Sequence, residues 1–547
     1  MNNYLLICEM GPIDDFTRHS RKTIDFWSGS FIFSYLMAET ARKISSFGAE
    51  IFLPSLENNP LCFGDGIVTC GSVPDQIYVL LNDDNKAEIE DVLKDVISET
   101  LKDVVGKIEA KKGSNIDLCE INNFFNFFHI IHEIKNHYPT HKEFIEAEQK
   151  IKMRAAIRPF NQLKDQEWIP KWKKCSLCGD RKGVYSEPVD KKDAGHYEEE
   201  HICNVCILKR CLPKIVKEIV PKIDKRIVEK SHYQSTSDIA LSPIKVIIDD
   251  NERKEFGPLI DKCKKETEGI DISEGRYFYD VSFKKRFANW REDLLEKYPE
   301  LSWLDRPFYS IVYMDGDNMG EILKGSFPCI KDISKILSQF SNAVSDIVSD
   351  HHGQLIFAGG EDVNFIIHPE YLLDCIDELN GCYKGLMGNI SEKSTLSAGA
   401  IVCYHKYPLS QAILKAGKML HDHAKKYSGK NATAISLIKG HRETTSLTIS
   451  NSKIKTLEKL KESLLQTDIS RTTPYRIKKE IDILNRLADL SQRRNYLYAI
   501  IAGTRGLERT NKKIEELVDL LMEFGDVQTA INALLYTRFL IGEKKNA

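Results

Sequence analysis

Carboxylate side chains follow an apolar run in the middle of the chain. Residues 308–314 are rich in β-branched and aromatic types and pass directly into Asp315. This pattern predicts a buried strand with carboxylates at its exit. Apolar residues at helical spacing follow between residues 330 and 348, so a helix should separate this strand from the next one.

A second pair of carboxylates lies in a predicted hairpin turn. Residues 354–358 form a short apolar run, and strand-type residues resume at position 363. A glycine pair between two strands is typical of a hairpin turn. The turn residues are Gly359, Gly360, Glu361 and Asp362.

If the two strands are neighbours, Asp315, Glu361 and Asp362 converge at one edge of a sheet. Three carboxylates this close repel one another and shift their pKa values unless a cation lies between them. Their hard oxygen atoms select Mg²⁺ or Mn²⁺, which keep water and substrate phosphates as further ligands. Two such ions can deprotonate an attacking hydroxyl and stabilise a leaving pyrophosphate. The pattern therefore predicts nucleotidyl transfer, and a solvated acidic turn is the alternative without chemistry.

The order of strand, Asp-x-Asp, helix and glycine–acid hairpin resembles the palm domain of nucleotide cyclases, diguanylate cyclases and polymerases. Further stretches narrow the resemblance to the large subunit of type III CRISPR effector complexes, particularly the type III-B branch. They are residues 21–30, 397–402, 407–409 and 429–432. The resemblance covers most of the chain up to residue 440. The family usually carries Asp where this chain has Glu361, but cyclase relatives with Glu there are active, so metal binding is expected to survive.

The resemblance implies an α+β fold with two ferredoxin-like palm domains of the nucleotide cyclase and polymerase type, a zinc-binding helical insert and a C-terminal helical bundle. The expected domains are residues 1–100, a first, degenerate palm; 101–300, a helical domain with a zinc module; 301–445, the second palm with the Gly-Gly-Glu-Asp motif; and 446–547, a helical domain.

The first palm is expected from its own pattern of strand, helix, strand and strand, which is the order of a ferredoxin-like unit. No glycine–acid hairpin occurs before residue 150, so this copy should provide one wall of a nucleotide pocket, with Ser28 and Ser30 as candidate contacts. Residues 87–160 read as helical, and the aromatic stripe at 124–131 is expected to pack in a core rather than stack on bases.

The family often begins with an HD nuclease domain, whereas this chain starts directly at the palm strand. Its only His-Asp pair, His421-Asp422, lies in a late helical segment. Cleavage of single-stranded DNA by this subunit is therefore not expected.

Two CxxC pairs give the strongest signal outside the second palm. Their spacing allows four thiolates to surround one Zn²⁺ tetrahedrally, and a complete thiolate shell leaves no open position for a substrate. The pattern therefore predicts a structural zinc held by Cys175, Cys178, Cys203 and Cys206. Three nearby residues could compete as ligands: Cys211, His196 and His201.

A triphosphate needs cations beyond the metal ions, and lysines suit that purpose. The Lys-x-x-Gly-Lys-Asn spacing that contains Lys426 and Lys430 resembles the phosphate-binding end of cyclase palms. An ordinary basic helix C-terminus is the alternative. The other expected nucleotide contacts are Gly316, Asp317, Asn318, Gly359 and Gly360.

The expected activity joins adenylate from ATP to a hydroxyl, with two Mg²⁺ or Mn²⁺ ions as cofactors. The resemblance implies that the products are cyclic or linear oligoadenylate second messengers, made when an effector complex of further subunits and crRNA captures target RNA. One alternative is AMP transfer to another small molecule, such as S-adenosylmethionine, because the degenerate first palm could hold a different acceptor. A second is an inactive scaffold that binds crRNA and partner subunits.

Composition sets outer limits on these hypotheses. A chain of 547 residues implies three or four domains. Its net charge of −3 argues against a protein that coats nucleic acid by bulk charge, so RNA contacts should be local. The sequence contains no transmembrane-length apolar run and no signal-like N-terminus, which favours a cytoplasmic protein without a membrane partner. Beyond residue 445 the helical pattern carries no chemistry and favours packing against partner subunits.

Overall fold

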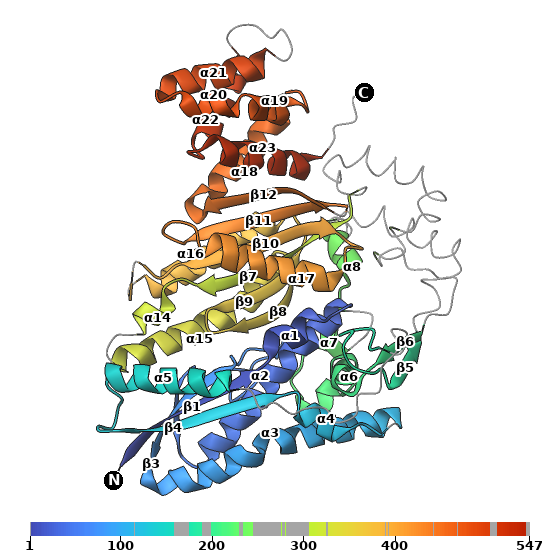
Figure 1. Cartoon of the computed structure of the whole chain (residues 1–547), viewed down its shortest axis with the longest axis vertical. Helices are drawn as coiled ribbons and strands as arrows, with labels where there is room; N and C mark the ends of the chain where they lie inside the picture. Colours follow the sequence, from blue (N-terminus) through green and yellow to red (C-terminus); the bar gives the residue numbers. More distant parts are fainter. Residues whose placement is uncertain are drawn as a thin grey trace.

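Two large β-sheets and a separate pair of strands make up the β-structure of the described part of the chain (Figure 1). The computed structural model describes residues 2–113, 115–157, 174–188, 199–228, 233–243, 275, 279, 306–323, 327–388, 390–391, 393–440, 442–467, 469–503 and 511–542. No helix within these ranges is both long enough and apolar enough to cross a bilayer.

The first sheet has the strand order β2-β3-β1-β4, with all neighbours antiparallel. This is the order of a ferredoxin-like unit, so the expected first palm is confirmed. Its strands are β1 (Asn3–Gly11), β2 (Glu50–Leu53), β3 (Gln76–Asn82) and β4 (Asn126–Ile134). Its helices are α1 (Ile13–Arg18), α2 (Thr23–Ser46) and α3 (Asp83–Lys112).

The helical interpretation of the aromatic stripe is wrong, because those residues enter strand β4. This strand pairs with β1 along its whole length, from Asn126 opposite Gly11 to Ile134 opposite Asn3. It lies between α4 (Leu118–Asn122) and α5 (His141–Ala156). Aromatic and β-branched residues fit a pleated, half-buried surface, and a short apolar run does not separate helix from strand by periodicity. The first sheet therefore extends past residue 100, where the first domain was expected to end.

The second sheet has the order β12-β11-β10-β7-β9-β8, in which the last four strands repeat the ferredoxin-like order of the first sheet. The second palm is thus confirmed, and β11 adds to it in parallel with β10. The strands are β7 (Phe308–Gly316), β8 (Gln354–Gly359), β9 (Asp362–Ile367), β10 (Leu396–Tyr404), β11 (Ala432–Lys439) and β12 (Arg442–Ser450). Helices α15 (Phe327–Asp350) and α16 (Leu372–Met387) pack against each other beside it.

The two sheets are connected through the edge strand β8. The Ala358 N–H donates to the Gly71 carbonyl oxygen at 3.1 Å, and Gly71 forms an isolated β-bridge with Phe357. Helix α2 contacts β8, and α15 contacts β2. Because backbone and helix contacts both cross between the sheets, the two palms are packed side by side rather than linked only by the chain.

A small module packs on the first palm through helix α6 (Asn204–Ile219), which follows the strand pair β5 (Tyr185–Pro188) and β6 (Glu199–Ile202). Arg210 of α6 bonds both carboxylate oxygens of the buried Asp25 in α2, at 2.9 and 3.1 Å. Two charged groups buried this way fix the module against α2. Much of the expected helical domain at 101–300 lies outside the described residues.

Helices follow β12 to the end of the described chain, at the top of Figure 1, and the expected C-terminal helical bundle is confirmed. They are α18 (Ile454–Gln466), α19 (Thr473–Lys479), α20 (Ile481–Arg486), α21 (Leu490–Ala502), α22 (Lys512–Met522) and α23 (Val527–Ile541). Helix α23 packs on α18 and on β12, which attaches the bundle to the second palm.

An acidic contact between α16 and α18 should make stability depend on pH. Burial, a hydrogen bond that the protonated Glu458 donates to Asp374, and the nearby charges of Asp374 and Asp377 raise the pKa of Glu458 to about 7. A carboxyl group whose pKa is raised by folding stabilises the fold below its unfolded pKa and loses that contribution as pH rises toward 7. Glu458→Gln should therefore raise the melting temperature at pH 8 and not at pH 5. Thermal unfolding of this variant and of Glu462→Gln, an exposed control on the same helix, tests it; equal shifts at both pH values would contradict it.

Candidate active site

The structure brings Asp315, Glu361 and Asp362 together at one edge of the second sheet. Asp315 lies near the end of β7, and Asp362 begins the neighbouring antiparallel strand β9. Glu361 lies in the turn between β8 and β9, where Gly360 has a φ of +65°. A Cβ at Gly316 would lie 2.8 Å from the Glu361 side chain. Glycine at position 316 is therefore what allows Glu361 to lie beside Asp315.

The three carboxylates perturb one another. Burial and then the charge of Asp315 raise the pKa of Glu361 to about 7. Asp362 keeps exposed surface, yet the protein around its carboxyl group and the charges of Glu361 and Asp315 raise its pKa well above the ordinary value. Raised pKa values of neighbouring carboxylates are typical of a functional site in which burial and like charges disfavour the ionised form. Among the described residues, the cysteine cluster below is the group of three or more His, Cys, Asp or Glu side chains whose ligand atoms all lie within 4.8 Å of one another. The three carboxylates would therefore have to close around a divalent cation to hold it.

Lys425 places an ammonium group inside this acidic cluster. Its Nζ donates to the carbonyl oxygens of Asp315 at 2.9 Å and Gly316 at 2.6 Å. It also lies 3.2 Å from Asp315 Oδ2 and 3.0 Å from Asp317 Oδ1. The sequence interpretation selected its neighbour Lys426, together with Lys430, as the phosphate contacts. Lys425 offsets part of the negative charge and fixes the end of β7.

Asp317 is turned into the protein and not toward a ligand. Its buried carboxylate accepts hydrogen bonds from Thr395 Oγ1 at 2.8 Å, Ser397 Oγ at 2.9 Å and the Asn431 N–H at 2.9 Å. With Lys425, these donors satisfy the carboxylate, as a buried charge requires. Asp317 therefore ties β7 to β10 and to the segment that precedes β11.

A cavity of about 800 Å³ lies beside the acids. Its lining combines one edge of the second palm with helix α5, which packs on β1 and β4 of the first sheet. The lining residues from the second palm include Asp315, Gly316, Asn318, Glu361, Lys425 and Lys430. Those from α5 are Phe144, Ile145, Glu148, Gln149 and Lys152. The wall provided by the N-terminal half is therefore α5, which the sequence did not single out.

Lys430 reaches the same cavity. Its Nζ donates to Asn318 Oδ1 at 2.9 Å, and both residues have left-handed backbone angles, with φ of +53° and +62°. Asn318 precedes the short helix α14 (Met319–Ile322), which lines the cavity. The two side chains hold the loop after β7 against the loop that precedes β11.

Six expected nucleotide contacts lie outside the lining of this cavity: Ser28, Ser30, Asp317, Gly359, Gly360 and Lys426. Ser28 and Ser30 are buried within α2, which faces α6 and β8. Lys426 is exposed and pairs with Asp422 at 2.9 Å, four residues earlier along the chain. The placement thus favours Lys425 over Lys426 and gives the two serines a packing role. His421 and Asp422 are both exposed on the segment Met419–Ala424.

The first palm adds acidic charge near the site. Asp75, just before β3, raises the pKa values of both Glu361 and Asp362 through its charge. The pKa of Asp75 is itself raised to about 6, by desolvation and then by Glu9. The negative charge of the site therefore comes from both palms.

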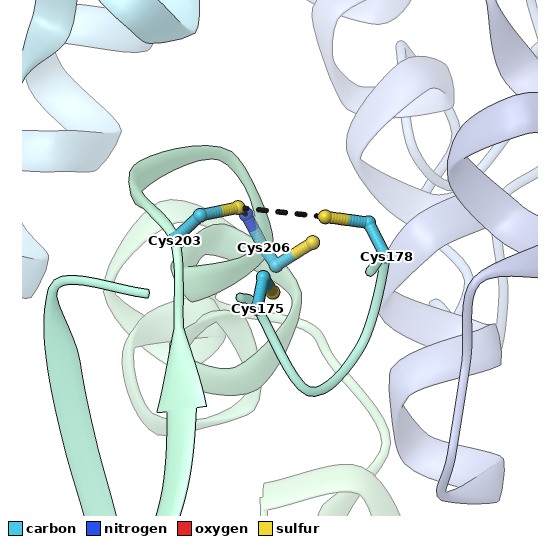
Figure 2. A group of neighbouring side chains, drawn as sticks. All are labelled: Cys175, Cys178, Cys203 and Cys206. Atoms are coloured by element: carbon cyan, nitrogen blue, oxygen red, sulfur yellow. Dashed lines mark hydrogen bonds between the residues drawn. The ribbon is translucent and has the colours of Figure 1, made fainter. Parts of the chain in front are cut away.

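Four cysteines form a second candidate site (Figure 2). Their sulfur atoms all lie within 4.8 Å of one another, and all four residues are buried. Hydrogen bonding within the cluster, with Cys175 the largest contribution, holds the pKa of Cys178 well below its ordinary value. Four close thiols of this kind are compatible with tetrahedral Zn²⁺. The members are Cys175, Cys178, Cys203 and Cys206.

The competing ligands considered from sequence do not join this cluster in the described part of the chain. Cys211 and His201 are described but are not members of the group. His196 lies outside the described residues. Cys203 caps the N-terminus of α6, and the Cys206 N–H donates to its sulfur at 3.4 Å, so the helix start fixes the second CxxC pair.

Two ferredoxin-like palms with an acidic turn beside a lysine-lined cavity define a protein of the nucleotidyltransferase and cyclase palm class. Comparison with known families is more specific. Residues 308–434 match the second palm domain of Cas10/Cmr2, and residues 5–108 match the N-terminal region of the CRISPR-associated protein Cmr2. Both matched regions, and the relative below, are similar to the large subunit of type III CRISPR effector complexes, in the type III-B branch.

Individual relatives agree with this assignment. The CRISPR system Cmr subunit Cmr2 of Pyrococcus furiosus is 23% identical over 546 residues, which cover 80% of this chain. The chain spans 61% of the length of that relative.

Solved structures show the same fold at low identity. A type III-B Cmr-beta complex in the apo state matches 99% of this chain and 82% of its own, at 14% identity and a TM-score of 0.66. The Cmr-beta complex bound to cognate target RNA matches 99% and 83%, at 14% identity and a TM-score of 0.68. A Csm1-Csm4 cassette in complex with pppApA matches 99% and 70%, at 10% identity and a TM-score of 0.50.

Proposed function

We propose that the second palm transfers adenylate from ATP to a hydroxyl group and releases pyrophosphate. The observation that carries this proposal is that Asp315 and Glu361 line a cavity together with two lysines, while Asp362 follows Glu361 at the start of β9. These three carboxylates are the proposed ligands of two Mg²⁺ or Mn²⁺ ions. When bound, such ions supply positive charge for the phosphoryl oxygens and lower the pKa of a coordinated hydroxyl.

The chain's own groups have separate tasks in this proposal. Burial, and then the neighbouring carboxylates, raise the pKa values of Glu361 and Asp362, and a bound cation would stabilise the charged form of both groups. Lys430, at the opposite side of the loop after β7, is the proposed phosphate contact. Gly359 and Gly360 belong to the turn that carries Glu361 and lie outside the cavity lining, and the Phe357 ring covers the side of Gly359 where a Cβ would project. Asn318 and Gly316 line the same cavity.

We further propose that the products are cyclic or linear oligoadenylates and that the chain acts in a type III-B complex with other subunits, crRNA and target RNA. Similarity to the Cas10/Cmr2 family supports the assembly. Among relatives of the same fold, a Cmr-beta complex binds cognate target RNA, and a Csm1-Csm4 cassette binds pppApA.

A second candidate is AMP transfer to an acceptor other than ATP. Glu148 of α5 lines the cavity, and Asp75 of the first palm adds a further carboxylate close enough to raise the pKa of Glu361. These negative charges would repel a second triphosphate, whereas they would attract a cationic acceptor such as S-adenosylmethionine. An inactive scaffold is less favoured, because three mutually repelling carboxylates have no structural purpose without a cation.

Mass spectrometry of the reaction products tests the proposal. The purified complex would receive ATP, Mg²⁺ and target RNA, with and without a panel of acceptor metabolites. Adenylate oligomers in the reaction without added acceptors would support oligoadenylate synthesis. A product that requires an added acceptor would support AMP transfer to another small molecule. The absence of any product in either reaction would contradict both proposed activities.

The phosphate role distinguishes two neighbouring lysines. Lys430→Ala should raise the KM for ATP by about 10- to 100-fold, because a cation that contacts phosphate is lost. Lys426→Ala removes an exposed side chain paired with Asp422 and should leave ATP use unchanged. Steady-state kinetics on both variants measures this contrast. A larger effect at Lys426 would show that the nucleotide lies on the outer face of the helix.

The cysteine cluster is proposed to hold one structural Zn²⁺. All four sulfur atoms are mutually close, so a bound ion would have a full set of protein ligands and no position for a substrate. The expected division of the chain into four domains remains a proposal, with the first palm extended to include β4.

A further inference from the structure

The segment that carries Lys425 toward the acids is a π-helix. Helix α17 (Leu409–Lys418) continues into a π-helical turn, Met419–Ala424, and the Lys425 N–H donates to the Leu420 carbonyl oxygen at 2.9 Å. This bond spans five residues instead of four. In an uninterrupted α-helix Ala424 would make it, so the π turn puts Lys425 directly above Leu420 where alanine would otherwise lie. Such turns are rare and are frequent at functional sites.

The π turn lies against strand β10 at a glycine. A Cβ at Gly399 would be 2.1 Å from the Leu420 backbone nitrogen and 2.6 Å from its Cα. Both atoms belong to the backbone, so no side-chain rotation could relieve the clash. Position 399 therefore admits only glycine at this approach. Ser397 of β10 pairs with Asp315 of β7. Gly399, where the π turn contacts β10, is therefore two residues along the strand from the partner of Asp315.

The close contact between the π turn and Gly399 determines where the Lys425 ammonium lies relative to the acidic cluster. Lys425 is 15% exposed, and two of its hydrogen bonds go to carbonyl oxygens at the end of β7. Its charge then lies 3.2 Å from Asp315 Oδ2. A displacement of the π turn from β10 would withdraw this ammonium from Asp315. The neighbouring Lys426 points to Asp422 and is not available to replace it.

We infer that Gly399 and the π-helical turn Met419–Ala424 are a positioning device that holds the Lys425 ammonium on Asp315 and so fixes that carboxylate for a divalent cation. The inference rests on the proposed function for the identity of the cation. Gly399 and Lys425 act through Asp315 and are positioning residues.

Mn²⁺ binding to the purified full-length protein, measured by calorimetry without nucleotide, tests the device. Lys425→Met should weaken Mn²⁺ binding by on the order of tenfold, in the range found for residues that orient metal ligands. Gly399→Ala should weaken it similarly, because the added Cβ displaces the turn. The double variant should bind Mn²⁺ about as tightly as the single variant with the lower affinity, because both changes remove the same contact.

Gly417→Ala is the matched control. It makes the same change on helix α17, where a Cβ would meet nothing within 4 Å, and Mn²⁺ affinity should not change. Thermal unfolding shows whether each variant is folded. If Gly399→Ala does not fold, the Mn²⁺ affinity of Lys425→Met alone tests the inference. Unchanged or tighter Mn²⁺ binding in Lys425→Met would overturn the inference, because removal of the ammonium also removes its repulsion of the cation. A double variant whose loss equals the product of the two single losses would overturn it as well. Wild-type protein that binds Mn²⁺ but yields no nucleotide product would contradict the proposed function and leave the positioning result standing.

Discussion

Replacing Asp315 with alanine should lower product formation by on the order of 10³-fold or more, because a lost metal ligand removes several kcal/mol of transition-state stabilisation. The paired change of Glu361 and Asp362 to alanine should do the same. Complex assembly and target-RNA binding should persist, since the three carboxylates lie at a sheet edge and not in the hydrophobic core. Product formation would be followed by mass spectrometry, and RNA binding by gel shift.

Two control variants sharpen this experiment. Asp350→Ala removes an exposed acid at the end of α15 and should leave the rate unchanged. Glu361→Asp keeps a carboxylate in the turn and should retain substantial activity, which tests the departure from the family motif. If variants without these carboxylates still consume ATP in the presence of target RNA, the assignment of the active site is wrong and the scaffold hypothesis gains.

The part of the site that could be predicted from sequence is the part fixed by local pattern. A strand that ends in Asp315 and a glycine hairpin that carries Glu361 are short-range features, and antiparallel pairing of β7 with β9 brings them together. The positions of Asp315 and Glu361 therefore follow largely from short-range sequence patterns. The same holds for the two CxxC pairs, where spacing alone brings four sulfur atoms together.

The remaining parts depend on contacts that no local pattern encodes. Strand β4 contains an apolar run that suits either a helix or a strand, and only its pairing with β1 decides. Lys425 faces the acids because one π turn changes the helical phase, and that turn depends on a close approach to Gly399. Helix α5 lines the cavity through tertiary packing alone, so Glu148 and Lys152 carried no signal in the sequence.

The cysteine cluster leads to the second large expected effect, which concerns folding rather than chemistry. Cys203 and Cys206 lie at the start of α6, and that helix also carries Lys209 and Arg210 into the first palm. Lys209 is buried and donates to the carbonyl oxygens of Phe16 and His19, both at 2.6 Å. The position of α6 therefore connects the cluster to the packing of the first sheet.

Replacing Cys175 and Cys206 together with serine should abolish zinc binding and leave little soluble protein, or lower its melting temperature severely. Binding of structural Zn²⁺ in small modules contributes about 10–16 kcal/mol, which becomes folding free energy because the site does not exist in the unfolded chain. Metal analysis of the purified protein and thermal unfolding would measure both effects. Cys119→Ser, at an exposed cysteine of α4, is the control and should retain zinc and stability. A soluble, stable and fully active double variant without zinc would contradict the structural role, because the remaining two thiols cannot complete a tetrahedral shell.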